Sequence, residues 1–220
     1  MAIQSEPTKF FQGLGLIEGA VFNDGSKLFV LIDGVKFDLV APQKKKQAFI
    51  MFLIEIVKKK KAGQIFKLLV YPRVIHFPKQ DEPSIIKFQL VGFSQDEGIE
   101  KTTGLKVGEF RFSGLWQYIP VCPYPVLSIM CNRIEEKEKQ MAIKTCHVPI
   151  DTTKLKMPSP KIYRFKKGVD GSPKFLSLTA KFVAEKENSR WVLEKFTSKL
   201  SDPPRFVKFK KEFKKELKSA

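Results

Sequence analysis

The chain has 220 residues, of which 40 are Lys or Arg and 23 are Asp or Glu, so its formal net charge is +17. Hydrophobic residues make up 43% and include 20 Phe, enough to bury a core, which excludes a wholly disordered basic tail. Three cysteines without a CxxC pair favour a reducing compartment over a disulfide framework, and no apolar run approaches the roughly 20 residues of a transmembrane helix. We therefore expect a folded cytoplasmic protein.

Positive charge is concentrated in three segments of the sequence. Residues 43–80, 154–181 and 205–220 together carry a net +21, whereas the rest of the chain carries −4. Solubility needs only mixed charge of modest size, so this clustering indicates a surface that binds a polyanion. A generally lysine-rich proteome is the alternative explanation.

The first ninety residues alternate between strand patterns and turn signals. Strands are predicted over 11–22, 27–32 and 35–40, separated by turns at 23–26 and 33–34. A helix follows, because Ala48, Phe49, Phe52, Leu53, Ile56 and Val57 form one apolar stripe at helical spacing, and Gly63 is placed to end it. Strands resume over 65–77 and 84–93, which gives the order β-β-β-α-β-β.

This order over residues 11–93 resembles the OB-fold, a Greek-key barrel used widely to bind oligonucleotides. Three strands followed by a helix are also similar to the repeat of the PUR and Whirly families of single-stranded nucleic-acid binders, whose repeats place four strands before each helix. Both resemblances imply a nucleic-acid ligand.

The second half also reads mainly as strands. We expect a loop over 96–108, strands over 109–119, 126–131, 174–184 and 190–196, a short exposed helix over 134–141, and an irregular connection over 152–160. At the C-terminus, Phe206, Phe209, Phe213 and Leu217 recur at helical spacing among basic residues. Such a helix could dock on the protein's own core, on nucleic acid or on a membrane surface.

The predicted architecture is mainly β, of the α+β class. An OB-like antiparallel barrel with one packed helix occupies residues 1–95, a further antiparallel β unit that may continue the first occupies 96–200, and a basic amphipathic helix or tail occupies 201–220. No sequence repeat of fixed period supports a duplication.

Known catalytic motifs are absent from the sequence. It has no phosphate-binding loop, no GxSxG elbow and no HExxH, and only two histidines, His76 and His147. The spacings of Cys122, Cys131 and Cys146 match no common zinc pattern. We therefore expect neither an enzyme nor a metal or other cofactor; an enzyme acting on an anionic substrate would need a histidine beside a carboxylate or a thiol.

Aromatic and basic residues are interleaved on several predicted strands. Alternation places Tyr71, Arg73 and Phe77 on one face of a strand, with Lys87 and Arg111 on neighbouring strands, and it places Trp116 and Tyr118 together. Rings beside cations are typical of surfaces that stack bases and hold phosphates. Burial in the core is the alternative for each ring. A third cluster comprises Tyr163, Arg164, Lys166 and Lys167.

Two lysine runs bracket the predicted helix: Lys44, Lys45 and Lys46 before it, and Lys58, Lys59, Lys60 and Lys61 at its end. They would contact phosphates without reading sequence, or simply keep the helix solvated. Together these patterns predict a protein that binds single-stranded DNA or RNA with low sequence specificity. The alternative is a scaffold or assembly protein whose basic face docks an acidic protein partner or a membrane-associated complex.

Overall fold

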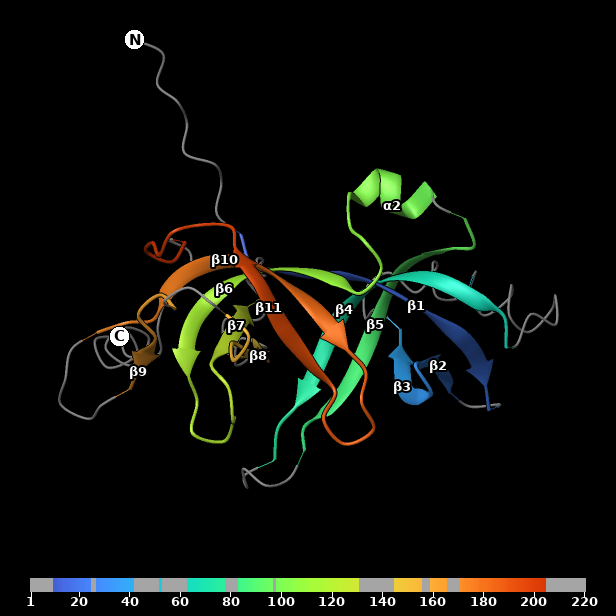
Figure 1. Cartoon of the computed structure of the whole chain (residues 1–220), viewed down its shortest axis with the longest axis horizontal. Coiled ribbons are helices and arrows are strands. Elements are labelled where there is room, and N and C mark those ends of the chain that lie inside the picture. Colours follow the sequence, from blue (N-terminus) through green and yellow to red (C-terminus); the bar gives the residue numbers. More distant parts are fainter. Residues whose placement is uncertain are drawn as a thin grey trace, which may run out of the picture.

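A computed structural model describes residues 10–24, 27–41, 52, 63–77, 83–96, 98–130, 145–155, 159–165 and 171–204. The strands are β1 (Gln12–Asn23), β2 (Leu28–Ile32), β3 (Val35–Val40), β4 (Ile65–Ile75), β5 (Ile85–Ser94), β6 (Glu109–Tyr118), β7 (Val126–Met130), β8 (Thr145–Asp151), β9 (Tyr163–Arg164), β10 (Lys174–Val183) and β11 (Arg190–Phe196), and one helix, α2 (Gly98–Thr103), follows β5. The protein is therefore mainly β, as its sequence predicts (Figure 1).

The first five strands form a closed barrel. Their pairing runs β1-β2-β3-β5-β4 and returns to β1, and every pair is antiparallel except β3–β5. This is the strand order of an OB-fold, which confirms the predicted OB-like barrel. The tight β2–β3 turn is made by Asp33 and Gly34, whose φ angles of 49° and 78° are those that a two-residue hairpin turn requires.

The predicted packed helix is described at one position, Phe52. This residue is helical and fully buried, and its ring centroid lies 5.3 Å from that of Phe66 on β4 and 4.6 Å from that of Phe93 on β5. The apolar stripe thus reaches the barrel core at Phe52. Both flanking lysine runs, the predicted helix over 134–141 and the C-terminal segment 205–220 lie outside the described residues.

The remaining long strands form a second ring. Its pairing runs β6-β7-β8-β11-β10 and returns to β6, the same order as the first ring. The match extends to orientation, since β8 and β11 are parallel as β3 and β5 are. The unit over 96–200 was predicted to be antiparallel, and the parallel β8–β11 pair corrects this. Strand β8, which completes the ring, was not predicted from the sequence. The short β9 adds another parallel pairing, to β6.

Strand β1 belongs to both rings. Its residues Gln12–Gly15 pair with β6, and Gly15–Ala20 pair with β4, so Gly15 has one neighbour in each ring. A Cβ atom at Gly15 would lie 2.2 Å from ring atoms of Phe110, so only glycine lets this ring approach the strand so closely.

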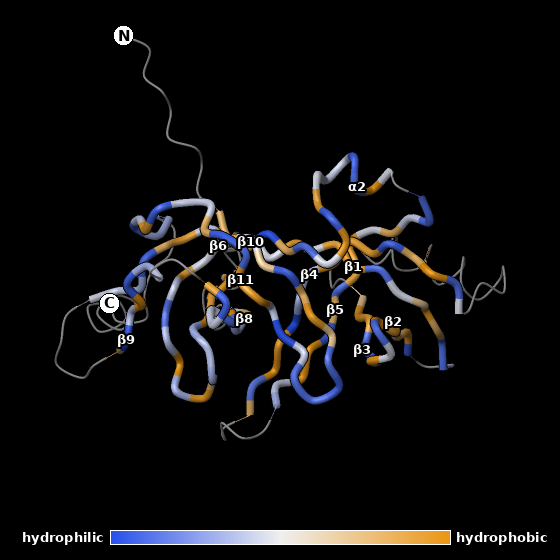
Figure 2. The backbone as a smooth tube through the Cα atoms, viewed as in Figure 1, coloured by the Kyte–Doolittle hydropathy of each residue, from blue (hydrophilic) through white to orange (hydrophobic). Residues whose placement is uncertain are grey.

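The rings also share one hydrophobic core. Phe182 of β10 lies with its ring centroid 5.4 Å from Phe37 and 5.3 Å from Phe88, both of the first ring, and 5.1 Å from Trp191 of the second. The strands alternate between apolar and polar residues, and the tip of the β10–β11 hairpin is hydrophilic (Figure 2). Because Phe182 packs on aromatic rings of both, the two rings form one packed body.

The segment predicted as a loop over 96–108 contains α2. Asp96 accepts hydrogen bonds from Ser94 Oγ (2.6 Å) and from the Gly98 N–H at the start of the helix (2.9 Å), and these bonds lower the pKa of Asp96. At the other end, the Arg111 side chain donates to the carbonyl oxygens of Thr103 and Gly104. Asp96 just before the helix and Arg111 on β6 thus cap the two ends of a six-residue helix where a loop was predicted.

Among the described residues, no helix combines the length and the apolar character that a membrane crossing needs.

Candidate nucleic-acid interface

Cross-strand pairing brings side chains from all five strands of the first ring into one continuous row. Phe22 pairs with Phe29, Phe29 with Asp38, Asp38 with Lys87, and Lys87 with Arg73. Alternate residues such as Val21, Leu28, Phe37, Phe88 and Pro72 are buried, so these five side chains face away from the barrel interior. We call Phe22, Phe29, Asp38, Lys87 and Arg73 the outer row.

Three residues predicted from the sequence meet here. Arg73 and Lys87 are direct cross-strand partners, and Tyr71, paired with Gln89, lies two positions along β4 and is 40% exposed. Arg73 Nε donates to Gln89 Oε1 (3.0 Å), which fixes the guanidinium on the surface. Lys87 Nζ lies 2.8 Å from Asp38 Oδ2, so the charge of Lys87 is partly compensated by Asp38.

The aromatic end of the outer row was missed by sequence reasoning. The rings of Phe22 and Phe29 are stacked, with centroids 5.4 Å apart and an interplanar angle of 13°, and the Nζ of exposed Lys36 lies 4.0 Å from the Phe29 centroid. The signal was present: in the predicted hairpin, alternation already separates Phe22 and Phe29 from the buried Val21 and Leu28.

Trp116 is a correction. Its side chain is fully buried, its Nε1 donates to the carbonyl oxygen of Pro160 (3.4 Å), and its ring packs edge-on against Phe196 (6.0 Å), so it is not available to stack bases. Tyr118 is half-buried, and the Arg164 guanidinium carbon lies 4.5 Å from the centroid of its ring.

The other predicted residues of the second ring also have partners within the protein. Arg111 caps α2, as described above, and the Tyr163 hydroxyl donates to the carbonyl oxygen of Gly171 (3.1 Å). Lys166 and Lys167 lie outside the described residues. The aromatic and basic residues predicted here thus form no open platform in the part of the chain that the structure describes.

The second ring also offers less open surface on its equivalent strands. β7 and β8 occupy the places that β2 and β3 occupy in the first ring; neither β7 nor β8 has an exposed residue, whereas Lys36 of β3 is exposed. β8 lies against β4, where the Cys146 thiol donates to the carbonyl oxygen of Pro72 (3.5 Å).

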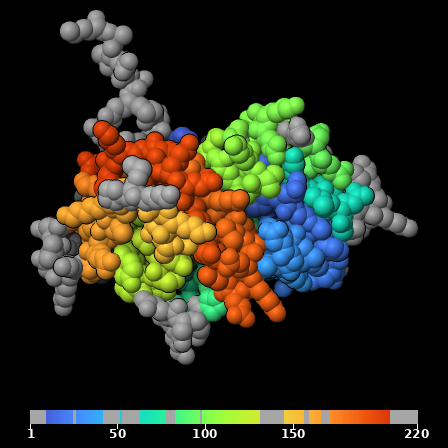
Figure 3. Space-filling model, viewed as in Figure 1, coloured from blue at the N-terminus to red at the C-terminus, as the bar shows by residue number. Residues whose placement is uncertain are grey.

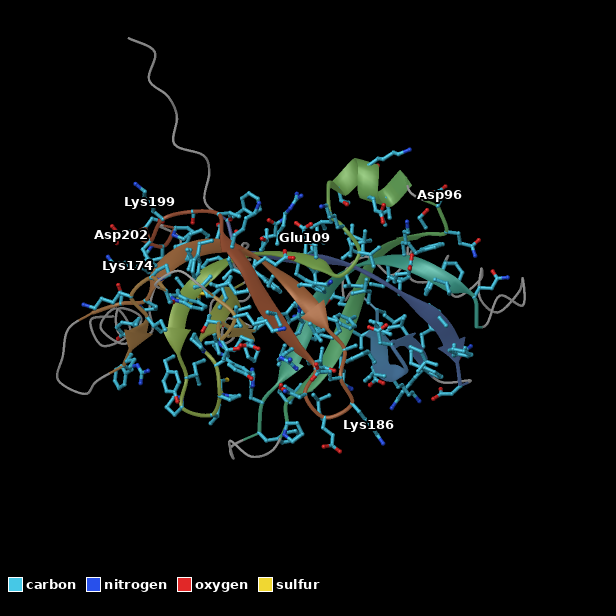
Figure 4. The ribbon with its side chains drawn as sticks, viewed as in Figure 1. Asp96, Glu109, Lys174, Lys186, Lys199 and Asp202 are labelled. Carbon is cyan, nitrogen blue, oxygen red and sulfur yellow. The ribbon has the colours of Figure 1, made fainter. Side chains whose placement is uncertain are left out.

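A cavity of about 330 Å³ lies between the rings. We call it the inter-ring cleft; residues that line it include Lys36, Phe77 and Ile85 from the first ring and Tyr124, Lys186 and Arg190 from the second. The β4–β5, β6–β7 and β10–β11 hairpins all project toward the same lower edge of the molecule in Figure 1, and Lys186 stands at the tip of the last (Figure 4). Predicted residue Phe77 thus lies in the cleft, beyond the end of β4.

The two histidines and a cysteine meet between the rings. His76 Nε2 donates to the carbonyl oxygen of His147 (2.7 Å), and the thiol of Cys122 lies 3.5 Å from His76 Nδ1. Ser128 Oγ bonds His147 Nδ1 (2.7 Å) and accepts a hydrogen bond from Gln117 Nε2 (2.6 Å).

Burial controls the ionisation of this cluster. It raises the pKa of Cys122 to about 11, and together with the charge of His76 it lowers the pKa of His147. Within the described residues, no group of three or more His, Cys, Asp or Glu is placed to hold a metal ion.

Comparison with known proteins gives a weak likeness, at the level of solved structures. No protein-family model matches the sequence, and no curated protein matches it. Among solved structures, the wild-type single-stranded DNA binding protein from Thermus aquaticus aligns with 91% of this chain and 97% of its own, with a TM-score of 0.39 and 9% sequence identity. A likeness of this size leaves the fold to be established by the strand pairings described above.

Proposed function

We propose that this protein binds single-stranded nucleic acid on the outer row of its first ring. The observation that carries the proposal is the stacked pair Phe22 and Phe29 with Lys36 beside it, on β1–β3 of an OB-type barrel. OB-folds bind oligonucleotides on the face of their second and third strands, which here are β2 and β3. Aromatic rings stack any base, so this site would have little sequence specificity.

Stacking a base on the Phe29 ring is worth more than the contact that the Lys36 ammonium makes with this ring. A cation over an exposed ring contributes about 0.5–1 kcal/mol, whereas a stacked base contributes about 1–3 kcal/mol. Lysine has a flexible stem, so the Lys36 ammonium can leave the Phe29 ring and hold the phosphate of the stacked nucleotide. Arg73, at the other end of the outer row, supplies a second phosphate contact.

Titrations of labelled oligo(dT) and oligo(U) at several salt concentrations test this proposal. Phe29→Leu keeps apolar volume but removes the stacking face, and we expect it to weaken binding roughly fivefold to hundredfold. Arg73→Ala should reduce the salt slope by about 0.7, the value for one phosphate of a single strand. The remote Lys199→Ala variant is the control. Absence of binding at low salt, or binding without a salt slope, contradicts the proposal.

We also propose that the protein is not an enzyme. The Cys122 thiol lies beside His76, the arrangement that a thiol nucleophile needs, but burial raises the pKa of Cys122 to about 11. The thiol is therefore protonated at neutral pH, and only the thiolate is an effective nucleophile. The Ser128 hydroxyl next to His147 is also buried, away from any substrate in solution.

A protein partner is the second candidate. Ile75 and Ile85 pair across β4 and β5 and are 47% and 43% exposed, so they form an apolar strip next to the Arg73–Lys87 pair of the outer row. Affinity capture after nuclease treatment separates the two functions. A partner retained after nuclease favours docking of an acidic protein, and one lost with the nuclease favours nucleic acid.

A further inference from the structure

The inter-ring cleft continues the outer row. Lys36 links the two, because its Nζ lies 4.0 Å from the ring centroid of Phe29 in the outer row and the residue also lines the cleft. Ile85 lines the cleft too and lies two positions from Lys87 on β5. In the space-filling view, the orange segment of the β10–β11 hairpin lies beside the blue segment of β2 and β3, so the two rings are in contact on this face (Figure 3). The outer row and the cleft are therefore neighbours, joined at Lys36.

The chemistry of the cleft suits a nucleotide. Its walls carry the cations Lys36, Lys186 and Arg190 against one acid, Glu187, and the ring of Tyr124. Arg190 is paired with Asp151 (3.1 Å) and Glu185 (2.6 Å), which fix its guanidinium in the wall and compensate its charge. Lys36 and Lys186 are therefore the cations that the cleft offers to a phosphate. Binding pockets span roughly 300–1,000 Å³, and 330 Å³ lies at the lower end, the size for one small unit of a chain.

One wall residue has an unmet hydrogen bond. Trp191 lines the cleft, and its buried indole N–H has no acceptor among the described residues. Buried donors without acceptors are rare and costly, so a polar ligand that reached this N–H would gain a hydrogen bond that the protein does not supply.

We propose that the inter-ring cleft binds a nucleotide of the same strand that lies on the outer row, so that both rings hold one single strand together. This inference rests on the proposed function. Because the second contact is made by a strand already held by the first, it adds affinity through high effective concentration. Affinity should therefore rise sharply once an oligonucleotide is long enough to reach from Phe29 to Lys186.

Oligonucleotide length and charge reversal test the inference in the full chain. Labelled oligo(dT) is titrated in a short form, of about 4 nucleotides, and a long form of about 16, the range of OB-fold sites. Lys186→Glu should weaken binding of the long form roughly tenfold, since it sets an anion beside a phosphate, and leave the short form unchanged. Tyr124→Ala should behave in the same way. Lys199→Glu is the matched control, an exposed lysine remote from the cleft (Figure 4).

The outcomes separate this inference from the proposed function. If the unmodified protein binds neither form, both fail. If it binds the long form and Lys186→Glu and Lys199→Glu have equal effects, the inference alone is overturned. Binding of poly-glutamate, but not of oligo(dT), that is sensitive to Lys186→Glu would assign the cleft to an acidic peptide and overturn it as well.

Tryptophan emission provides an independent readout. The chain has two tryptophans, so a Trp116→Phe variant leaves Trp191 of the cleft as the sole reporter. We expect the long oligonucleotide to change Trp191 emission and the short one to leave it unchanged. Equal responses to both forms would contradict occupancy of the cleft.

Discussion

At the scale of single residues, the polar network between the rings makes stability depend on pH. Ser128 Oγ bonds His147 Nδ1 (2.7 Å) and also accepts from Gln117 Nε2 (2.6 Å), so His147 is tied into a part-buried network. Burial and the charge of His76 lower the pKa of His147 in the folded state. Protonation is therefore easier in the unfolded chain, whose histidines titrate near pH 6.5.

We predict that stability falls as the pH drops below about 6.5. The contribution of His147 is complete above this value and is lost as the pH falls toward the lowered folded-state pKa, with a slope of up to about 1.4 kcal/mol per pH unit for one proton. Urea unfolding between pH 7.5 and pH 5 measures it. The side chain of His147→Asn cannot titrate, so this variant should show a smaller difference in stability between pH 7.5 and pH 5. An equal pH dependence in the variant and the unmodified protein would show that groups other than His147 cause it.

The exposure of single side chains was predicted correctly on a strand with one open face and wrongly on a strand whose two faces are both covered. On β4, alternation correctly placed Tyr71 and Arg73 outside. On β6, Leu115 packs with Phe11 and Phe175 on one side while Trp116 lies in the main core on the other, so neighbours in sequence are both buried. Period-2 spacing shows which residues share a face, but tertiary packing decides what covers that face.

At the scale of elements, the passage of β1 from one ring to the other depends on Gly15. We predict that Gly15→Ala destabilises the fold by about 1–3 kcal/mol, the usual cost of overpacking, because the new Cβ would meet the buried Phe110 ring. Thermal unfolding of the variant measures the loss. The matched control is Gly92→Ala on β5, where the nearest heavy atom to a new Cβ is 3.9 Å away. Equal stability of the two variants would contradict this role of Gly15.

Strand prediction was most accurate where local signals suffice. The bounds of β3 and β11 match the predicted strands, because turn residues and alternation mark both. Strand β8 was missed since Cys146, His147 and Pro149 give it no strand pattern and its pairing with β7 and β11 is long-range. Helix α2 was missed because it has only six residues and none of them is buried, so no apolar stripe marks it in the sequence.

At the scale of the whole molecule, the shared core makes the two rings one folding unit. Phe182 contacts Phe37 and Phe88 across the boundary between rings, so neither ring retains its packing when the other opens. The sequence carries no fixed-period repeat, and the common strand order emerges only from the pairings. Strand order depends on which residues are buried, and very different sequences can satisfy the same burial pattern.

We predict a single unfolding transition. Both tryptophans lie in the second ring, on β6 and β11, so their fluorescence reports that ring, whereas far-ultraviolet circular dichroism reports all strands. The unfolding midpoints reported by the two signals should coincide. Phe182→Ala should lower the free energy of unfolding by about 3–5 kcal/mol and shift both midpoints together. Separate midpoints, or a shift in the fluorescence midpoint alone, would show that the rings fold independently.

The place of Phe182 late in the chain has a consequence during synthesis. All strands of the first ring have left the ribosome once Ser94 has, but Phe182 follows 88 residues later. At about 5–20 residues per second, Phe37 and Phe88 wait roughly 5–20 s for the aromatic ring that covers them. During that interval the nascent chain exposes apolar surface, so we expect translation speed and chaperone supply to govern the yield of this protein more than its final stability does.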